Sequence, residues 1–153
     1  MNKLNVEKKI ADLNLGTSGE LDVLEILKLR HGDNVKQFTR KYAPFDYYVT
    51  NDNNEIIKEY ELKTRRCGIK TYPTLAFGLN KLEYADKRNK ENVETSFLWN
   101  LNEGLYEWDY NGTQTYEVSS ICNKARNDKP HDAVYVDTKF IKPFNNQYYM
   151  SFH

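Results

Sequence analysis

Two acidic residues and a lysine have types and spacings that could place them together in space. They are Asp46, in the segment FDYYVT, and Glu61 and Lys63, in the segment EYELKTRR. Carboxylate oxygens are the ligands that Mg²⁺ prefers in proteins. A bound metal draws charge off a phosphate oxygen and lowers the pKa of a water, and a nearby lysine can orient or deprotonate that water. The chemistry that suits this set is phosphodiester hydrolysis.

Both segments have the alternation of a β-strand. Residues 51–54, NDNN, separate them, so we expect an antiparallel hairpin with an Asn- and Asp-rich turn. With that turn Asp46 faces Glu59, and Glu61 is its diagonal neighbour on the same face, with side chains roughly 7–8 Å apart. Lys63 lies on this face about 7 Å further along the strand. The hairpin therefore predicts that the two acids and the lysine occupy one small volume.

A fourth residue, Glu20, is expected in the first turn of a helix over residues 19–30, GELDVLEILKLR. Apolar residues follow it at three, four and seven positions, so Glu20 heads the apolar stripe of that helix. A carboxylate on a buried face needs a partner, and a metal site on the sheet would provide one. Glu20 also completes a capping box with Thr17, in which it bonds the amide of the cap residue. Both interpretations stand.

The charged strand face has a simpler explanation, because Glu59, Glu61 and Lys63 could be the solvated side of an ordinary sheet with cross-strand ion pairs. That explanation does not account for Asp46, which lies in an aromatic strand on the same face. Glu59 is the ambiguous residue, since it could be a spare ligand, a ligand of a second metal, or solvated.

A competing acid-x-lysine set, Asp137-Thr138-Lys139, ends the apolar strand AVYV. Its acidic partner would have to be Asp132, on the same strand, or Glu117, further away in the chain. Neither gives the simple geometry of a hairpin, so we favour the earlier site.

These motifs resemble the PD-(D/E)xK nuclease superfamily, in its Holliday-junction-resolvase-like and restriction-endonuclease-like branch. The resemblance covers residues 17–90, about half of the chain. Phe45 separates the Pro from the Asp, and Asn80 stands where the family has Gln. The matching residues are Glu20, Pro44-Phe45-Asp46, Glu61-Leu62-Lys63, and Asn80 with Tyr84 in the following helix.

The resemblance implies an α/β fold with an αβββαβ core, in which helices flank a mixed central sheet. It also implies a Mg²⁺-dependent DNA endonuclease that leaves a 5′-phosphate and a 3′-hydroxyl, with Mn²⁺ able to substitute. By the same resemblance, Asp46, Glu61 and the backbone carbonyl of Leu62 bind the metal. Lys63 is the catalytic residue, and Glu20 supports it.

The DNA substrate, duplex or branched, would lie against the residues beside this set. The resemblance places Asn80 and Tyr84 there. Arg65 and Arg66 follow the lysine directly and could contact phosphates or only solvent. A cut on both strands, or at a symmetric junction, needs two sites, so a homodimer is expected.

Composition sets the remaining limits. The chain has 153 residues and no repeat or linker, so we expect one nuclease-like domain over 1–153. Formal net charge is zero, which argues against a wholly electrostatic nucleic-acid binder. Cys67 and Cys122 are not in a zinc-binding spacing, and they suit a reducing compartment, although one disulfide remains open.

The chain has no apolar stretch near the ~18 residues of a membrane span, and no apolar run follows its charged start, so we expect neither a span nor a signal peptide. The expected location is the cytoplasm. The abundance of Asn, Lys and Tyr would suit an AT-rich genome, such as that of a virus or phage, and the location would then be the host cytoplasm.

Further elements are expected around this core. Strand-like residues 35–42 precede the hairpin, and a helix covers residues 77–90, after a loop. A second hairpin pairs 95–101 with 105–110, and residues 113–118 extend its sheet. A short helix near 119–125 and a strand over 132–140 complete the extra C-terminal elements.

Two other functions remain open at this point. The fold could be kept without catalysis, as a module that binds DNA or a protein, and the Asn at position 80 and the neutral charge favour this. An RNA nuclease is a third possibility.

Overall fold

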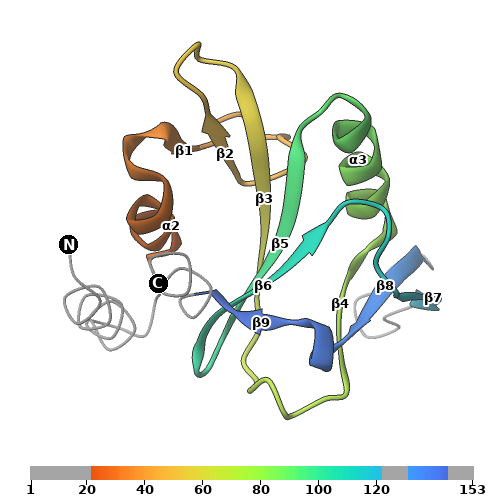
Figure 1. Cartoon of the computed structure of the whole chain (residues 1–153). Coiled ribbons are helices and arrows are strands. Elements are labelled where there is room, and N and C mark those ends of the chain that lie inside the picture. Colours follow the sequence, from red (N-terminus) through yellow and green to blue (C-terminus); the bar gives the residue numbers. More distant parts are fainter. Residues whose placement is uncertain (1–21, 122–130, 145–153) are drawn as a thin grey trace.

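The computed structural model describes residues 22–121 and 131–144, which form a mixed α/β fold (Figure 1). Within these residues one sheet has six strands and a second sheet has three. Glu20 lies outside the described residues, as do the predicted capping box and most of the predicted helix at 119–125. No helix in the described part is long and apolar enough to cross a membrane.

The six-stranded sheet has the order β1-β2-β3-β5-β6-β9. Strands β3 and β5 are parallel and their other neighbours are antiparallel, so the sheet is mixed. The chain needs a long crossover to return from β3 to β5, and that crossover contains a helix. The six strands are β1 Val35–Gln37, β2 Tyr47–Thr50, β3 Ile56–Thr64, β5 Glu94–Leu101, β6 Gly104–Tyr110 and β9 Lys142–Pro143.

The smaller sheet has the antiparallel order β4-β8-β7, with β4 Thr74–Gly78, β8 His131–Asp137 and β7 Glu117–Ile121. The α-helices in the described residues are α2 Val23–His31 and α3 Leu79–Lys90. Two single 3₁₀ turns, η1 Gly32–Asn34 and η3 Thr138–Phe140, follow α2 and β8.

Helix α2 has clear signals at both ends. A side-chain oxygen of Asp22 accepts a hydrogen bond from the amide of Glu25 at 3.3 Å, which caps the N-terminus. Gly32 ends the helix with φ of +64°, a conformation that glycine adopts without steric cost. The predicted stop at His31-Gly32 is therefore confirmed.

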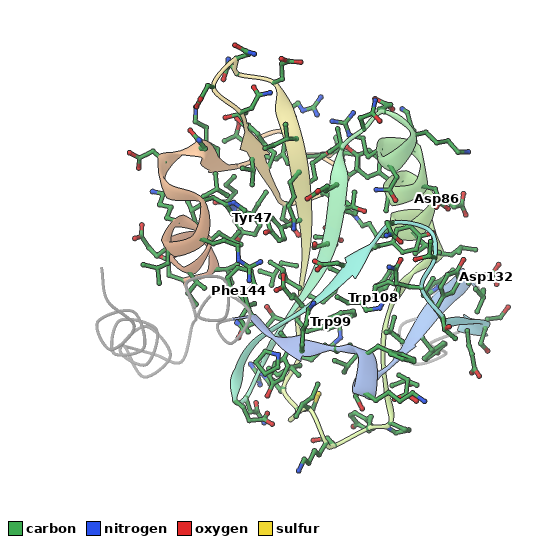
Figure 2. All side chains as sticks on the ribbon, viewed as in Figure 1. Tyr47, Asp86, Trp99, Trp108, Asp132 and Phe144 are labelled. Atoms are coloured by element: carbon green, nitrogen blue, oxygen red, sulfur yellow. The ribbon has the colours of Figure 1, made fainter. Side chains whose placement is uncertain are left out.

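The helices lie on opposite faces of the large sheet, and each face has its own core (Figures 1 and 2). Helix α2 covers the face that carries Tyr47 and Phe144. Helix α3 and the smaller sheet cover the other face, which carries Trp99 and Trp108. The α2 core contains Val23, Ile26, Leu27, Val35, Tyr47, Val49, Tyr60, Leu98, Leu105 and Phe144.

The core between α3, the two sheets and the loop before β2 is mainly aromatic. The rings of Phe77, on β4, and Phe97, on β5, stack with their centroids 3.9 Å apart. The ring of Phe45 packs edge-on against Phe97 and also contacts Tyr84 of α3. Phe97 therefore joins the smaller sheet, the large sheet and the start of β2.

Several element predictions are wrong in detail. Residues 74–78 form strand β4 rather than a loop and a helix start, because their buried positions alternate and Gly78 caps α3. Residues 117–121 pair with β8 instead of extending the β5–β6 sheet, and Gly112, with φ of +92°, lies in the segment that connects β6 to β7. Ser119 and Ser120 are in this strand, not in a helix. Only residues 35–37 of the predicted 35–42 segment are extended.

Truncating the ring that joins the two sheets should test this arrangement. We expect Phe97→Ala to lower the free energy of unfolding by about 3–5 kcal/mol, the usual cost of removing a buried phenyl ring. Urea denaturation measures it. Phe140→Ala, at a ring 45% exposed on η3, is the control and should cost far less. A similar small loss for both variants would contradict the central place of Phe97.

Candidate active site

The β2–β3 hairpin pairs in a different register from the predicted one. Tyr48 pairs with Glu59, and the register shifts between Val49 and Thr50. The prediction that Asp46 faces Glu59 is therefore wrong. A carboxylate oxygen of Asp46 instead accepts a hydrogen bond from the amide of Leu62 at 2.8 Å. This bond brings Asp46 to Glu61, closer than the diagonal relation that the sequence predicted.

Glu61 is buried, with 3% of its surface exposed, and it lies between two ammonium groups. Its Oε2 atom is 3.4 Å from Nζ of Lys63 and 3.3 Å from Nζ of Lys81. Burial, followed by the hydrogen bond and the charge of Asp46, raises the pKa of Glu61 to about 7, although the two lysines act in the opposite direction. The two carboxyl groups are thus close enough to share a proton.

The backbone of Leu62 faces the same space. In an extended strand the N–H and C=O of one residue point to the same edge. Because the Leu62 N–H points to Asp46, its carbonyl also lies on the β2 edge of β3, close to the Asp46 carboxylate. The structure thus brings together Asp46, Glu61, Leu62 and Lys63.

These groups fit a hard divalent cation. Mg²⁺ typically binds through one or two carboxylates, with water and substrate oxygens as further ligands. Two adjacent carboxyl groups that resist joint ionisation are a favourable place for a 2+ charge. The described part of the chain contains no group of three or more His, Cys, Asp or Glu suited to a metal. A metal at this place would therefore have two carboxylates and the Leu62 carbonyl as its protein ligands among the described residues.

Lys81 is a residue of this site that sequence reasoning missed. It lies in the first turn of α3, directly after the predicted contact residue Asn80, and its ammonium also donates a hydrogen bond to the carbonyl of Pro44. Lys81 therefore ties the start of β2 to Glu61 on β3. The signal was the helical periodicity, since the buried residues Leu82 and Ala85 orient the flank with Lys81 towards the sheet.

Asn80 and Tyr84, the two residues of α3 predicted to lie against the substrate, do not contact Glu61 as Lys81 does. Asn80 is exposed. The hydroxyl of Tyr84 donates to Oε1 of Glu59 at 2.8 Å, so its polar group is already used inside the protein.

Glu59 is neither solvated nor a further member of the carboxylate pair. It is fully buried, and besides Tyr84 it binds Nε of Arg88. The guanidinium of Arg88 also contacts Glu91 at 2.7 Å. This ion pair attaches the middle and end of α3 to the sheet, which holds the helix that carries Lys81.

Arg65 and Arg66 are exposed beyond the end of β3. Nη1 of Arg65 donates to the carbonyl of Thr64 at 2.9 Å, and its backbone amide donates to the carbonyl of Asn100 at 3.0 Å. Both side chains lie two or three residues after Lys63, where a bound phosphate backbone could reach them.

The competing acid-x-lysine set, Asp137-Thr138-Lys139, has a structural role. Oδ1 of Asp137 accepts a hydrogen bond from the amide of Lys139 at 2.9 Å and so caps the turn η3. The side chains of both residues are exposed, and their charged groups are 3.9 Å apart. Asp132 instead accepts from the hydroxyl of Ser120. Within the described residues, Asp137 belongs to no group of three or more His, Cys, Asp or Glu suited to a metal.

A separate open hollow of about 470 Å³ lies at the start of β5, away from the carboxylate pair. It contains polar groups, but Asp109 there already accepts from Ser96 at 2.6 Å and lies 3.9 Å from Lys58. None of the predicted site residues lines it. Its lining is Lys58, Asn89, Asn92, Val93, Glu94, Thr95, Ser96, Asp109, Tyr110, Asn111 and Gln114.

Comparison with protein families, with curated proteins and with solved structures finds no significant match to this chain. The functional interpretation therefore depends on the geometry of the site.

The raised pKa of Glu61 predicts a pH-dependent stability effect. The unfolded carboxyl ionises near its ordinary value of 4.5 and the folded one near 7, so its stabilising contribution is present below pH 4.5 and is lost as the pH rises to about 7. We expect Glu61→Gln to raise the free energy of unfolding at pH 8 by up to about 3 kcal/mol, and to give no such gain near pH 4.5.

Denaturant unfolding at the two pH values measures this difference. Glu83→Gln, which changes an exposed carboxylate on α3, is the matched control and should have little effect at either pH. A Glu61→Gln effect that is the same at both pH values would rule out the shifted carboxyl.

Proposed function

We propose that the protein is a metal-dependent deoxyribonuclease of the PD-(D/E)xK type, which hydrolyses phosphodiester bonds and leaves a 5′-phosphate and a 3′-hydroxyl. The observation that carries this proposal is the pair formed by the half-buried Asp46 and the buried Glu61, with the ammonium groups of Lys63 and Lys81 against Glu61. Because the pKa of Glu61 is raised, ionisation of both carboxyl groups near neutral pH destabilises the folded protein. Binding of a divalent cation would explain why the protein keeps the pair.

The fold supports the same proposal. A restriction-endonuclease-like αβββαβ core would consist of α2, β1, β2, β3, α3 and β5. These elements occur in that order, with β3 parallel to β5 and the two helices on opposite faces of the sheet. Strand β4 is inserted before α3, and it pairs in the smaller sheet without interrupting the large one.

Each group of the site has a role in this chemistry. Asp46, Glu61 and the Leu62 carbonyl would hold Mg²⁺ or Mn²⁺, which when bound supplies charge to a phosphate oxygen and lowers the pKa of a water. Asp46 is kept in position by the Leu62 amide. Glu61 must lose its proton before it can be a ligand, because its pKa is raised.

The two lysines have different roles. Lys81 has a second anchor on the Pro44 carbonyl, so its ammonium is fixed and suits a positioning role towards Glu61. Nζ of Lys63 contacts the same carboxylate at 3.4 Å, from the strand itself. We assign to Lys63 the orientation of the attacking water and the transfer of its proton. Cleavage of both strands of a duplex would require a homodimer.

One observation favours a second function. Both lysines are ion-paired to Glu61 in the protein alone, so the charges of the site are already largely balanced without a metal. A nuclease fold without catalysis, which binds DNA or a protein partner, would have no need of a metal. Metal binding therefore separates the two functions.

The direct test is incubation of the protein with branched, duplex and single-stranded DNA and Mg²⁺ or Mn²⁺. We expect cleavage, and we expect Lys63→Met to slow it by about 10²–10⁴-fold, the usual contribution of a general acid or base. Lys87→Met, at an exposed lysine of α3, is the matched control. The nuclease proposal fails if the wild-type protein cleaves none of these substrates, or if Lys63→Met cleaves as fast as the wild type.

Calorimetric titration with Mn²⁺ tests the metal ligands separately. We expect Asp46→Asn to weaken binding more than about a hundredfold, since loss of a group that merely orients a ligand already costs 10–100-fold. Wild-type affinity should rise with pH and level off above about 7, as Glu61 becomes ionised. Asp52→Asn, in the exposed hairpin turn, should bind normally. Unaltered binding by Asp46→Asn would place the metal elsewhere.

A further inference from the structure

The loop between β1 and β2 has an unusual surface. Arg40, Lys41 and Tyr42 are consecutive and exposed, and 86% of the surface of Tyr42 is accessible. Nζ of Lys41 lies 5.5 Å from the centroid of the Tyr42 ring. A single exposed ring is common on protein surfaces, so it is the two basic neighbours of Tyr42 and the position of the loop that point to a ligand.

The structure holds this loop beside the carboxylate pair. At its start, the amide of Phe38 donates to the carbonyl of Asp46 at 2.9 Å. At its end, the ammonium of Lys81 binds the carbonyl of Pro44. Between them the amide of Ala43 donates to the carbonyl of Arg40 at 3.2 Å, which closes a turn. The exposed Tyr42 is therefore carried four residues before Asp46 on an anchored turn.

A second basic and aromatic segment follows β3. Arg65, Arg66 and Lys70 are exposed there, and Tyr72 is 59% exposed. Since β2 and β3 are antiparallel, the residues before β2 and those after β3 extend from the same end of the hairpin. The carboxylate pair is thus preceded and followed in the chain by segments with positive charge and an exposed tyrosine ring, and the second segment is attached at Cys67 and Ile69 to the turn between β5 and β6.

The chemistry of these groups identifies the partner. Lysine and arginine side chains contact phosphates of any sequence. An exposed tyrosine ring stacks on the face of a base, but in a continuous duplex the neighbouring bases cover those faces. A ring that stacks on a base beside the scissile phosphate therefore needs a base that is unpaired.

We propose that the loop of residues 39–43 binds an unpaired nucleotide next to the scissile phosphate, with Tyr42 stacked on its base and Arg40 and Lys41 on its phosphates. The substrate is then single-stranded or branched nucleic acid rather than continuous duplex. This proposal rests on the proposed function, whose substrate class it narrows.

Binding can be measured without cleavage, by fluorescence anisotropy of labelled single-stranded, flapped and duplex DNA in EDTA. We expect Tyr42→Ala to weaken binding of the single-stranded and flapped DNA by about 5- to 100-fold, as for one stacked base. Duplex binding should change less than twofold. Tyr42→Phe keeps the ring and should bind like the wild type.

The matched control is Phe140→Ala. Phe140 is an exposed ring with a lysine beside it, Lys139, 5.0 Å from its centroid, but it lies on η3, at the end of the smaller sheet (Figure 1). It should bind all three DNAs normally. Thermal melting should give the same midpoint for Tyr42→Ala as for the wild type, because the ring is exposed.

Three results would overturn the loop proposal: unchanged binding by Tyr42→Ala, an equal loss on duplex, or no binding of any DNA by the wild type. The nuclease proposal fails separately. If the wild type cleaves DNA but Tyr42→Ala binds normally, only the loop proposal is wrong. If the wild type binds unpaired DNA through Tyr42 but never cleaves it, only the nuclease proposal is wrong.

Discussion

Two carboxyl groups side by side, one buried and one half-buried, are the constraint on which this structure depends. Asp46 is fixed by the amide of Leu62, and Glu61 is enclosed by the sheet and α3. Like charges at such a distance cannot both be ionised cheaply at low dielectric, so cations must surround them. Lys63 from the strand and Lys81 from the helix meet that need. Helix α3, which packs on the sheet through Leu82 and Ala85, brings Lys81 to that position.

A second buried charge helps to keep that helix in place. Glu59 is two residues before Glu61 and on the same face, yet it binds Tyr84 and Arg88 of α3. The strand therefore uses alternate positions for different purposes: Glu59 fastens the helix, and Glu61 and Lys63 form the site. The role of an acidic residue on this strand face thus depends on which residue of α3 contacts it. The strand sequence alone cannot distinguish an acid that anchors the helix from one that belongs to the site.

Local sequence patterns predict strands, turns and helices, but not which residues of different elements contact each other, and this limited the prediction of the fold and the site. Periodicity and turn chemistry were sufficient for the two hairpins, for most of α3, and for the meeting of Asp46 with Glu61. The register of the first hairpin was predicted incorrectly for two reasons. Thr50 pairs with Ile56 rather than Glu55, and the irregularity between Val49 and Thr50, which has no local signal, adds a second shift. Strand β4 was missed because it is short and pairs with β8, more than fifty residues further on. Lys81 was missed because its role depends on how α3 packs.

The ends of the large sheet limit how two copies of the chain could associate. One edge is β1, which has only three residues and carries exposed Lys36 and Gln37. The other edge, β9, has two residues, and Pro143 has no amide proton to donate. Short edges with a lysine or a proline are poor templates for adding a strand. We therefore do not expect an assembly of two copies to extend the six-stranded sheet into a continuous one.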